Sequence, residues 1–296
     1  MKKQNKYSQC GKKREKLFSN ICIAPSFIGS LFFFFVPFGI IVYYSLVNNP
    51  IMREFVGIDN FKLIVQNPAF KTAIKNTVSF SVIAVPLAVV LSLGLALLLD
   101  AKIPGKSVFR TFFLCPLMVP TASVVLVWQV IFHNYGTVNE FMSVFGFEGV
   151  DWLKSPYSHI VIICMFLWKN LGYNMVLFMS GLSAIPKDIV EVAELEGAGR
   201  FYKFVNIKLR YLSPTIFFVL IISLINSFKI FREVYLLSGD YPYGKMYLLQ
   251  HFMNNTFKSL DYQKLSASAI LLAIVMIVII GILFIAEKHF GKDVEE

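Results

Sequence analysis

Hydrophobic residues occur along this chain in six long runs, and most charged residues lie in the segments between them. A helix needs roughly 20 apolar residues to cross the hydrocarbon core of a bilayer, and each run is about that long. The pattern therefore predicts an all-α, multi-pass membrane protein with six transmembrane helices. They are expected at roughly Ile21–Leu46, Thr77–Leu99, Val108–Phe132, Ser158–Ala184, Ser213–Leu236 and Leu265–Ala286.

Composition supports this class, because 56% of the 296 residues are hydrophobic and the mean hydropathy is +0.65. No polar stretch is long enough to form a separate soluble domain. We therefore expect a basic cytoplasmic tail at 1–20, one transmembrane domain at 21–290 and a cytoplasmic tail at 291–296. The first apolar run exceeds the roughly 7–15 residues of a secretion signal, so it is predicted to be a retained helix.

The positive charges favour one orientation. Six spans place both termini on the same side of the cell membrane, and we expect that side to be the cytoplasm. The inner segments then hold most of the 28 Lys and Arg residues, as the positive-inside rule requires. The net charge of +10 is therefore interpreted as membrane topology, and no nucleic-acid partner is expected.

The cytoplasmic loop at 185–210 reads as two short helices joined at a corner. Lys187–Glu196 contains no helix breaker, and the small residues at 197–199 then end that helix and allow a sharp turn. Beyond the corner, Phe201, Phe204, Val205 and the stem of Lys208 recur with the spacing of one helical face. From the residues alone, such a helix-turn-helix either lies on the membrane surface or docks on another protein.

This loop also matches the signature of ABC-importer permeases, which is E-A-A, three residues, G, nine residues, and I-x-L-P. Val192 and Arg210 depart from the family's alanine and proline, and the matching positions are Glu191, Ala193, Gly197, Ile207 and Leu209. The string FVGIDNF at Phe55–Phe61 looks like the sugar-importing branch. Over roughly residues 20–290 the chain resembles a permease subunit of carbohydrate ABC importers of the maltose and glycerol-phosphate type.

The resemblance implies that the loop couples this chain to an ATPase. The residues expected to serve that coupling are Glu191, Ala193, Gly197, Ala198, Phe204, Ile207 and Leu209. It further implies a second related permease subunit, a cytoplasmic ABC ATPase dimer, an extracellular solute-binding protein and a sugar substrate. ATP would be bound by partner subunits and no cofactor is expected here, because Asp100 stands where a phosphate-binding loop ending at Gly105-Lys106-Ser107 needs its first glycine.

Polar residues within the fourth and fifth runs are candidates for a solute path, because such groups usually face a bundle interior or a cavity. Amides, hydroxyls and aromatic faces are the groups that a sugar needs. The candidates are Lys169, Asn170, Tyr173, Asn174, Asn226 and Lys229. The alternative interpretation of these residues is hydrogen bonding between helices.

Two other functions remain open, namely an ABC permease for a non-sugar solute and a secondary transporter driven by an ion gradient. The second is disfavoured because no acidic residue is expected deep in a span, where a proton or sodium site would need one. Neither a catalytic constellation nor a metal-ligand spacing is found, so the chain is not expected to be an enzyme. The four cysteines are interpreted as small apolar residues: Cys10, Cys22, Cys115 and Cys164.

Overall fold

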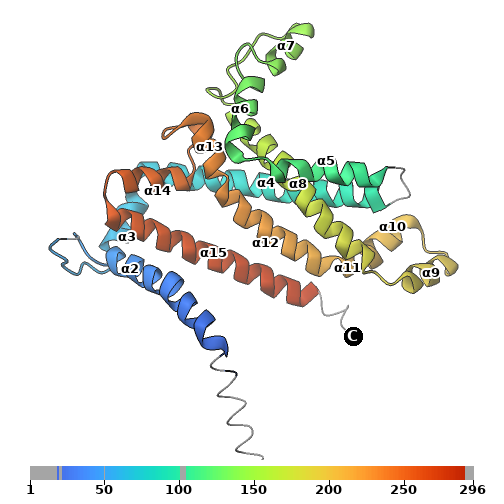
Figure 1. Cartoon of the computed structure of the whole chain (residues 1–296), viewed down its shortest axis with the longest axis horizontal. Coiled ribbons are helices and arrows are strands. Elements are labelled where there is room, and N and C mark those ends of the chain that lie inside the picture. Colours follow the sequence, from blue (N-terminus) through green and yellow to red (C-terminus); the bar gives the residue numbers. More distant parts are fainter. Residues whose placement is uncertain (1–18, 20–21, 50, 101–104, 291–296) are drawn as a thin grey trace, which may run out of the picture. The chain divides into compact units, whose positions relative to one another are not determined.

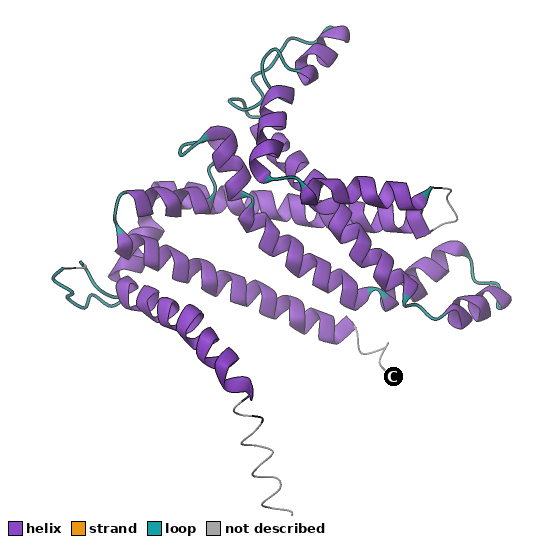
Figure 2. Ribbon diagram, viewed as in Figure 1, coloured by secondary structure: helices purple, strands orange, loops and turns teal. Residues whose placement is uncertain are grey.

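The computed structural model describes residues 19, 22–49, 51–100 and 105–290, and these residues are predominantly helical (Figures 1 and 2). Within them the β-structure is limited to one isolated bridge between Val47 and Phe55. The expected tail at 291–296, almost all of the tail at 1–20, and Cys10 lie outside the described residues.

The described residues contain five single helices that are long and apolar enough to cross a membrane. They are Cys22–Ser45, Pro68–Asp100, Ser158–Ser183, Ser213–Ser238 and Tyr262–Lys288. This confirms the all-α, multi-pass class. The predicted number of six is reached if the bent pair α5–α6 counts as one span.

The bent pair covers the predicted span Val108–Phe132. Helix α5 (Lys106–Met118) and helix α6 (Thr121–Ile131) meet at 101°, so this apolar run forms two helices with a sharp bend between them. Pro120 has no N–H to donate, and its ring disfavours the helical conformation for Val119, which is extended at φ −81° and ψ 132°.

The chain forms two compact units, and the first comprises residues up to Ile64 together with Leu260–Leu272. It contains a π-helical turn η1 (Leu31–Phe35), α2 (Val36–Ser45), the start of α3 (Asp59–Gln66) and the start of α15 (Tyr262–Phe290). Carbonyls at a helix C-terminus lack partners within the helix. The side chain of Asn60 donates to the carbonyls of Ser45 and Val47, both at 2.9 Å, so the FVGIDNF segment caps α2.

The second unit is built around α4 (Pro68–Asp100), α8 (Ser158–Ser183) and α12 (Ser213–Lys229), and α8 packs against both of the others and against α5. It also contains α6, the end of α3 and the later part of α15. Its other elements are α7 (Thr137–Val144), α9 (Lys187–Leu195), α10 (Arg200–Lys203), η2 (Phe204–Lys208), α11 (Leu209–Tyr211), α13 (Phe231–Ser238), η3 (Gly244–Met246) and α14 (Leu249–Lys258).

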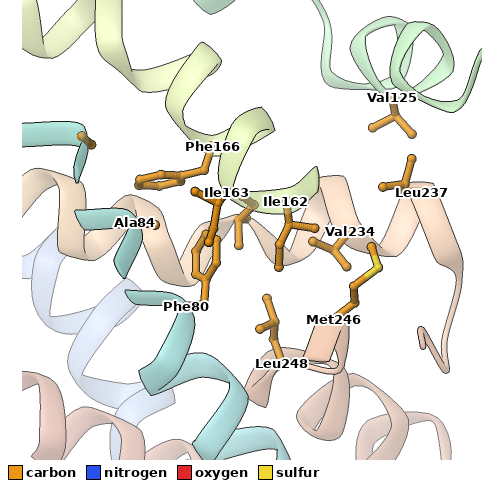
Figure 3. Close-up of a cluster of buried hydrophobic side chains, with 12 residues drawn as sticks. Phe80, Ala84, Val125, Ile162, Ile163, Phe166, Val234, Leu237, Met246 and Leu248 are labelled. Carbon is orange, nitrogen blue, oxygen red and sulfur yellow. The ribbon is translucent and has the colours of Figure 1, made fainter. Parts of the chain in front are cut away.

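Apolar side chains fill two buried clusters in this unit. The first joins α4, α8, α13 and the segment before α14, with Phe80, Phe166 and Val234 among its members (Figure 3). The second joins α4, α8 and α12, and includes Met175, Phe178 and Val219. These clusters hold α8 in place, and α8 carries most of the predicted solute-path residues.

Helix α5 approaches α8 closely at Gly172. A Cβ atom at this position would lie 1.8 Å from the carbonyl oxygen of Phe113, so only glycine fits without a backbone shift. This contact fixes α5 beside the part of α8 that carries Lys169 and Asn170.

Candidate functional site

A cavity of about 920 Å³ opens beside α8, α12 and α13. It is lined by Leu117, Met165, Phe166, Lys169, Asn170, Asn226, Lys229, Ile230, Phe231, Arg232, Glu233, Tyr235, Leu236 and Gln250. The lining therefore combines aromatic rings with amide groups and charges. Four of the six predicted solute-path residues belong to it: Lys169, Asn170, Asn226 and Lys229.

An ion pair crosses this cavity wall. Lys169 on α8 donates to the carboxylate of Glu233 on α13. Glu233 is only 4% exposed, and an isolated charge in such a position would be costly. Glu233 was not among the predicted solute-path residues, because it stands near the end of a predicted span. Its ion pair depends on contact between residues that are 64 positions apart, which the spacing of residues does not reveal.

Two amide bridges join α8 to α12. Asn226 donates to the side-chain oxygen of Asn170 at 2.9 Å, and Asn174 donates to the hydroxyl of Ser223 at 2.9 Å. The Asn170–Asn226 bridge lies at the cavity wall, whereas Asn174 is fully buried and does not line the cavity.

Tyr173 is also absent from the cavity lining. The structure thus brings Lys169, Asn170, Asn226 and Lys229 together and leaves Tyr173 and Asn174 outside that group. A helical face can be derived from the sequence, but which turns of that face meet a cavity depends on the neighbouring helices.

The loop at 185–210 forms a helical knob, which we define as Lys187–Tyr211. Helix α9 ends at Gly197 in a Schellman motif, in which Gly197 N–H donates to Glu194 and Ala198 N–H donates to Ala193, at 3.0 and 2.9 Å. Gly197 has φ +80°, and a Cβ atom placed on it would meet nothing within 4 Å. The glycine is therefore required by backbone conformation and not by crowding.

Beyond the corner, helical turns run from Arg200 to Tyr211 and pass through the π-helical turn η2. Two ion pairs support the knob: Lys203 with Glu194 across its arms, and Lys208 with Asp100 at the end of α4, the latter at 3.3 Å. The hydrogen bond and charge of Lys203 lower the pKa of Glu194 from its usual value.

The predicted coupling residues occupy different positions on this knob. Glu191 and Gly197 are exposed, Ala193 is buried, and the remaining members, Ala198, Phe204, Ile207 and Leu209, are half-buried. Leu195 and Phe201 were not among the predicted coupling residues, yet their side chains are 89% and 80% exposed. The sequence feature that could have identified them is the presence of large apolar residues beside a turn that is expected to be exposed.

A shallow groove of about 500 Å³ separates the arms of the knob. Its lining includes Asp188, Val192, Tyr202 and Arg210. The groove presents both apolar and charged groups, which suits contact with another protein more than with the hydrocarbon core.

The described residues contain no group of three or more His, Cys, Asp or Glu side chains that could hold a metal ion. Cys22, Cys115 and Cys164 are free.

Comparisons with known proteins place this architecture in context. The model of the family described as "Binding-protein-dependent transport system inner membrane component" matches residues 85–296. The trehalose/maltose transport system permease protein MalF of Thermococcus litoralis is 31% identical over 243 residues, covering 81% of this chain and 82% of MalF. The sn-glycerol-3-phosphate permease protein UgpA of Pectobacterium atrosepticum is 28% identical over 93% of this chain and 94% of UgpA.

A solved structure also matches the fold. It is a chain of a bacterial ABC transporter involved in the import of the acidic polysaccharide alginate, with a TM-score of 0.82 and 22% sequence identity. The match covers 95% of this chain and 98% of that chain.

Proposed function

The chain belongs to the family of binding-protein-dependent transport system inner membrane components, and we propose that it is a permease subunit of an ABC importer for a sugar or oligosaccharide. The observation that carries this proposal is the similarity to a trehalose/maltose permease over 81% of the chain and to an sn-glycerol-3-phosphate permease over 93% of it. The cavity beside α8, α12 and α13 supplies a place where such a solute can pass.

The solute path is proposed to run along the cavity wall formed by Lys169, Asn170, Asn226 and Lys229. Amide groups exchange hydrogen bonds with sugar hydroxyls, and the half-buried ring of Phe231 supplies an apolar face of the kind that lines binding pockets. Tyr173 and Asn174 are proposed to support the path from behind, since neither lines it.

The knob is proposed to dock on a cytoplasmic ATPase. Glu191 and Gly197 are exposed and available for contact, while Ala193 is buried and its small size favours close packing of the two arms. Ala198 belongs to the docked corner itself, and Phe204, Ile207 and Leu209 would transmit its movement to α12 because they lie on the helical turns leading to that helix.

This role requires partners. We propose a second related permease, a cytoplasmic ABC ATPase dimer that binds the ATP, and an extracellular solute-binding protein that delivers the sugar. Closure of the ATPase pair would draw the knobs together and open the membrane path outward. In the proposed orientation both termini are cytoplasmic, as the distribution of Lys and Arg favours. The chain itself would bind no cofactor and catalyse no reaction.

Uptake by proteoliposomes containing this chain, its partner permease, its ATPase dimer and its binding protein tests the proposal. ATP-dependent accumulation of a sugar, stopped by vanadate and unaffected by an uncoupler, is the expected result. Proteoliposomes loaded with ADP provide the matched control.

Uptake that persists with ADP and stops with the uncoupler would overturn the proposal in favour of an ion-driven secondary transporter. ATP-dependent uptake of amino acids or polyamines, but of no carbohydrate, would overturn only the choice of solute.

A further inference from the structure

Basic residues outnumber acidic residues in the lining of the cavity. Its lining contains the basic residues Lys169, Lys229 and Arg232 and the acidic residue Glu233. Lys169 and Glu233 form an ion pair, so their charges offset each other. Lys229 and Arg232 have no ion-pair partner among the residues that the structure describes.

These two cations lie in an unusual place for unpaired charge. Both belong to the apolar helix Ser213–Ser238, which qualifies as a candidate span. Cations inside a membrane segment are rare, face a cavity or the bundle interior, and usually mark a ligand or ion pathway. Lys229 and Arg232 both line the cavity, so they agree with that pattern.

The chemistry of the two cations selects one class of ligand. A guanidinium binds carboxylate, phosphate or sulfonate oxygens through paired hydrogen bonds, and an ammonium adds a compact positive charge beside it. A cavity lined by one sign of charge also concentrates ions of the opposite sign. A neutral sugar would leave both charges unpaired, whereas one acidic group would neutralise at least one of them.

Resting on the proposed function, we infer that the cavity takes an anionic carbohydrate or polyol, bearing a carboxylate, phosphate or sulfonate group. Lys229 and Arg232 bind the acidic group. The amides of Asn170 and Asn226, which already line the wall, meet the hydroxyls. The names of the relatives include both neutral disaccharides and a phosphorylated polyol, so the names do not say whether the solute of this chain is charged. The two cations of the cavity favour a charged solute.

The test uses the complete reconstituted transporter and pairs of probes that differ only in the acidic group. Suitable pairs are digalacturonate with galactobiose, glycerol 3-phosphate with glycerol, and 6-deoxy-6-sulfoglucose with 6-deoxyglucose. We expect the acidic member of at least one pair to be imported at least tenfold faster than its neutral counterpart.

The double variant Lys229→Gln/Arg232→Gln should lower uptake of that acidic probe at least tenfold. Lys229→Arg should retain most of the uptake, because the charge remains. Lys154→Gln is the matched control, since Lys154 is an exposed residue that does not line the cavity.

Three outcomes would contradict part of the argument, and they are distinguishable. Faster import of the neutral probes would overturn the inference and leave the proposed function intact. Loss of the partner permease from the purified double variant, with normal recovery of Lys229→Arg, would also overturn it by assigning the cations to carboxylates of that subunit. No ATP-dependent uptake of any probe, acidic or neutral, would contradict the proposed function itself.

Discussion

The bundle of α4, α8 and α12 and the knob at Lys187–Tyr211 are both helical, but different interactions hold them. The bundle buries its helices in two apolar clusters and joins them by amide bridges. The knob relies on a Schellman corner and an exposed ion pair, and it leaves Leu195 and Phe201 uncovered. The shape of the bundle therefore depends on its own packing, whereas the knob keeps an apolar surface available to another protein.

The largest effect on stability is expected at the contact between α5 and α8. Gly172→Ala places a Cβ atom 1.8 Å from the carbonyl oxygen of Phe113, so the two helices must separate. Overpacking of this kind should cost about 3 kcal/mol and lower the thermal aggregation temperature of the detergent-solubilised protein.

The matched control is Gly94→Ala on α4, where an added Cβ meets nothing within 4 Å. Because alanine favours a helix over glycine, this variant should be as stable as the wild type or more so. Equal stability of the two variants would contradict the close packing of α5 on α8.

Lowering the pH should destabilise the protein at His251 on α14 before it affects the ion pair of the knob. His251 on α14 is buried, which lowers its pKa to about 4 from 6.5. The unfolded chain therefore binds more protons than the folded one between these values, and stability should fall by about 3 kcal/mol as pH drops from 6.5 to 4. Glu194 in the knob has a lowered pKa, so its ion pair with Lys203 should persist through most of that window.

Thermal aggregation measured from pH 7 to pH 4 checks this expectation. His251→Gln removes the titration and keeps an acceptor for the N–H of Leu248, which His251 Nδ1 accepts at 3.2 Å. The variant should lose stability less steeply than the wild type over this range. An unchanged pH profile would show that His251 is not responsible.

A smaller loss is expected from the buried amide bridge. Asn174→Leu removes the hydrogen bond to Ser223 and should weaken the packing of α8 on α12 by about 1 kcal/mol. Sugar preference should not change, because Asn174 does not line the cavity.

The matched variant is Asn226→Leu, which removes the equivalent bridge to Asn170 at the cavity wall. It should alter uptake of the transported sugar as well as stability. Subunit recovery and uptake of two sugars, measured for both variants, decide the comparison. A changed sugar preference in Asn174→Leu alone would reverse the assignment of the two bridges.

A similarly small effect on stability, but a large effect on transport, is expected at the corner of the knob. Gly197→Asp places a side chain at φ +80° and adds a charge where the ATPase is proposed to dock, which should cost about 1 kcal/mol of stability. Stimulated ATP hydrolysis and uptake should be lost while the protein still inserts in the membrane.

Gly146→Asp is a close control for this variant. Gly146 also has φ +80°, ends α7 in the same Schellman pattern, and has open space around an added Cβ. It should show the same modest loss of stability with ATPase coupling retained. Normal uptake by Gly197→Asp would contradict docking at this corner.

The sequence alone determined the features that depend on local residue order. The length of each apolar run predicted the helices, and Gly197 predicted the corner of the knob, because backbone conformation at a helix end depends on a few adjacent residues. Lys169 and Asn170 were also selected from the sequence alone, as polar residues within a predicted span.

Tertiary structure decided which of these features meet. The ion pair of Lys169 with Glu233 and the separate environments of Asn170 and Asn174 both depend on contacts between distant segments. A helical pattern specifies the direction of a side chain relative to its own axis. It does not specify which neighbouring helix, cavity or charge that side chain reaches, because these are set by packing among helices far apart in the chain.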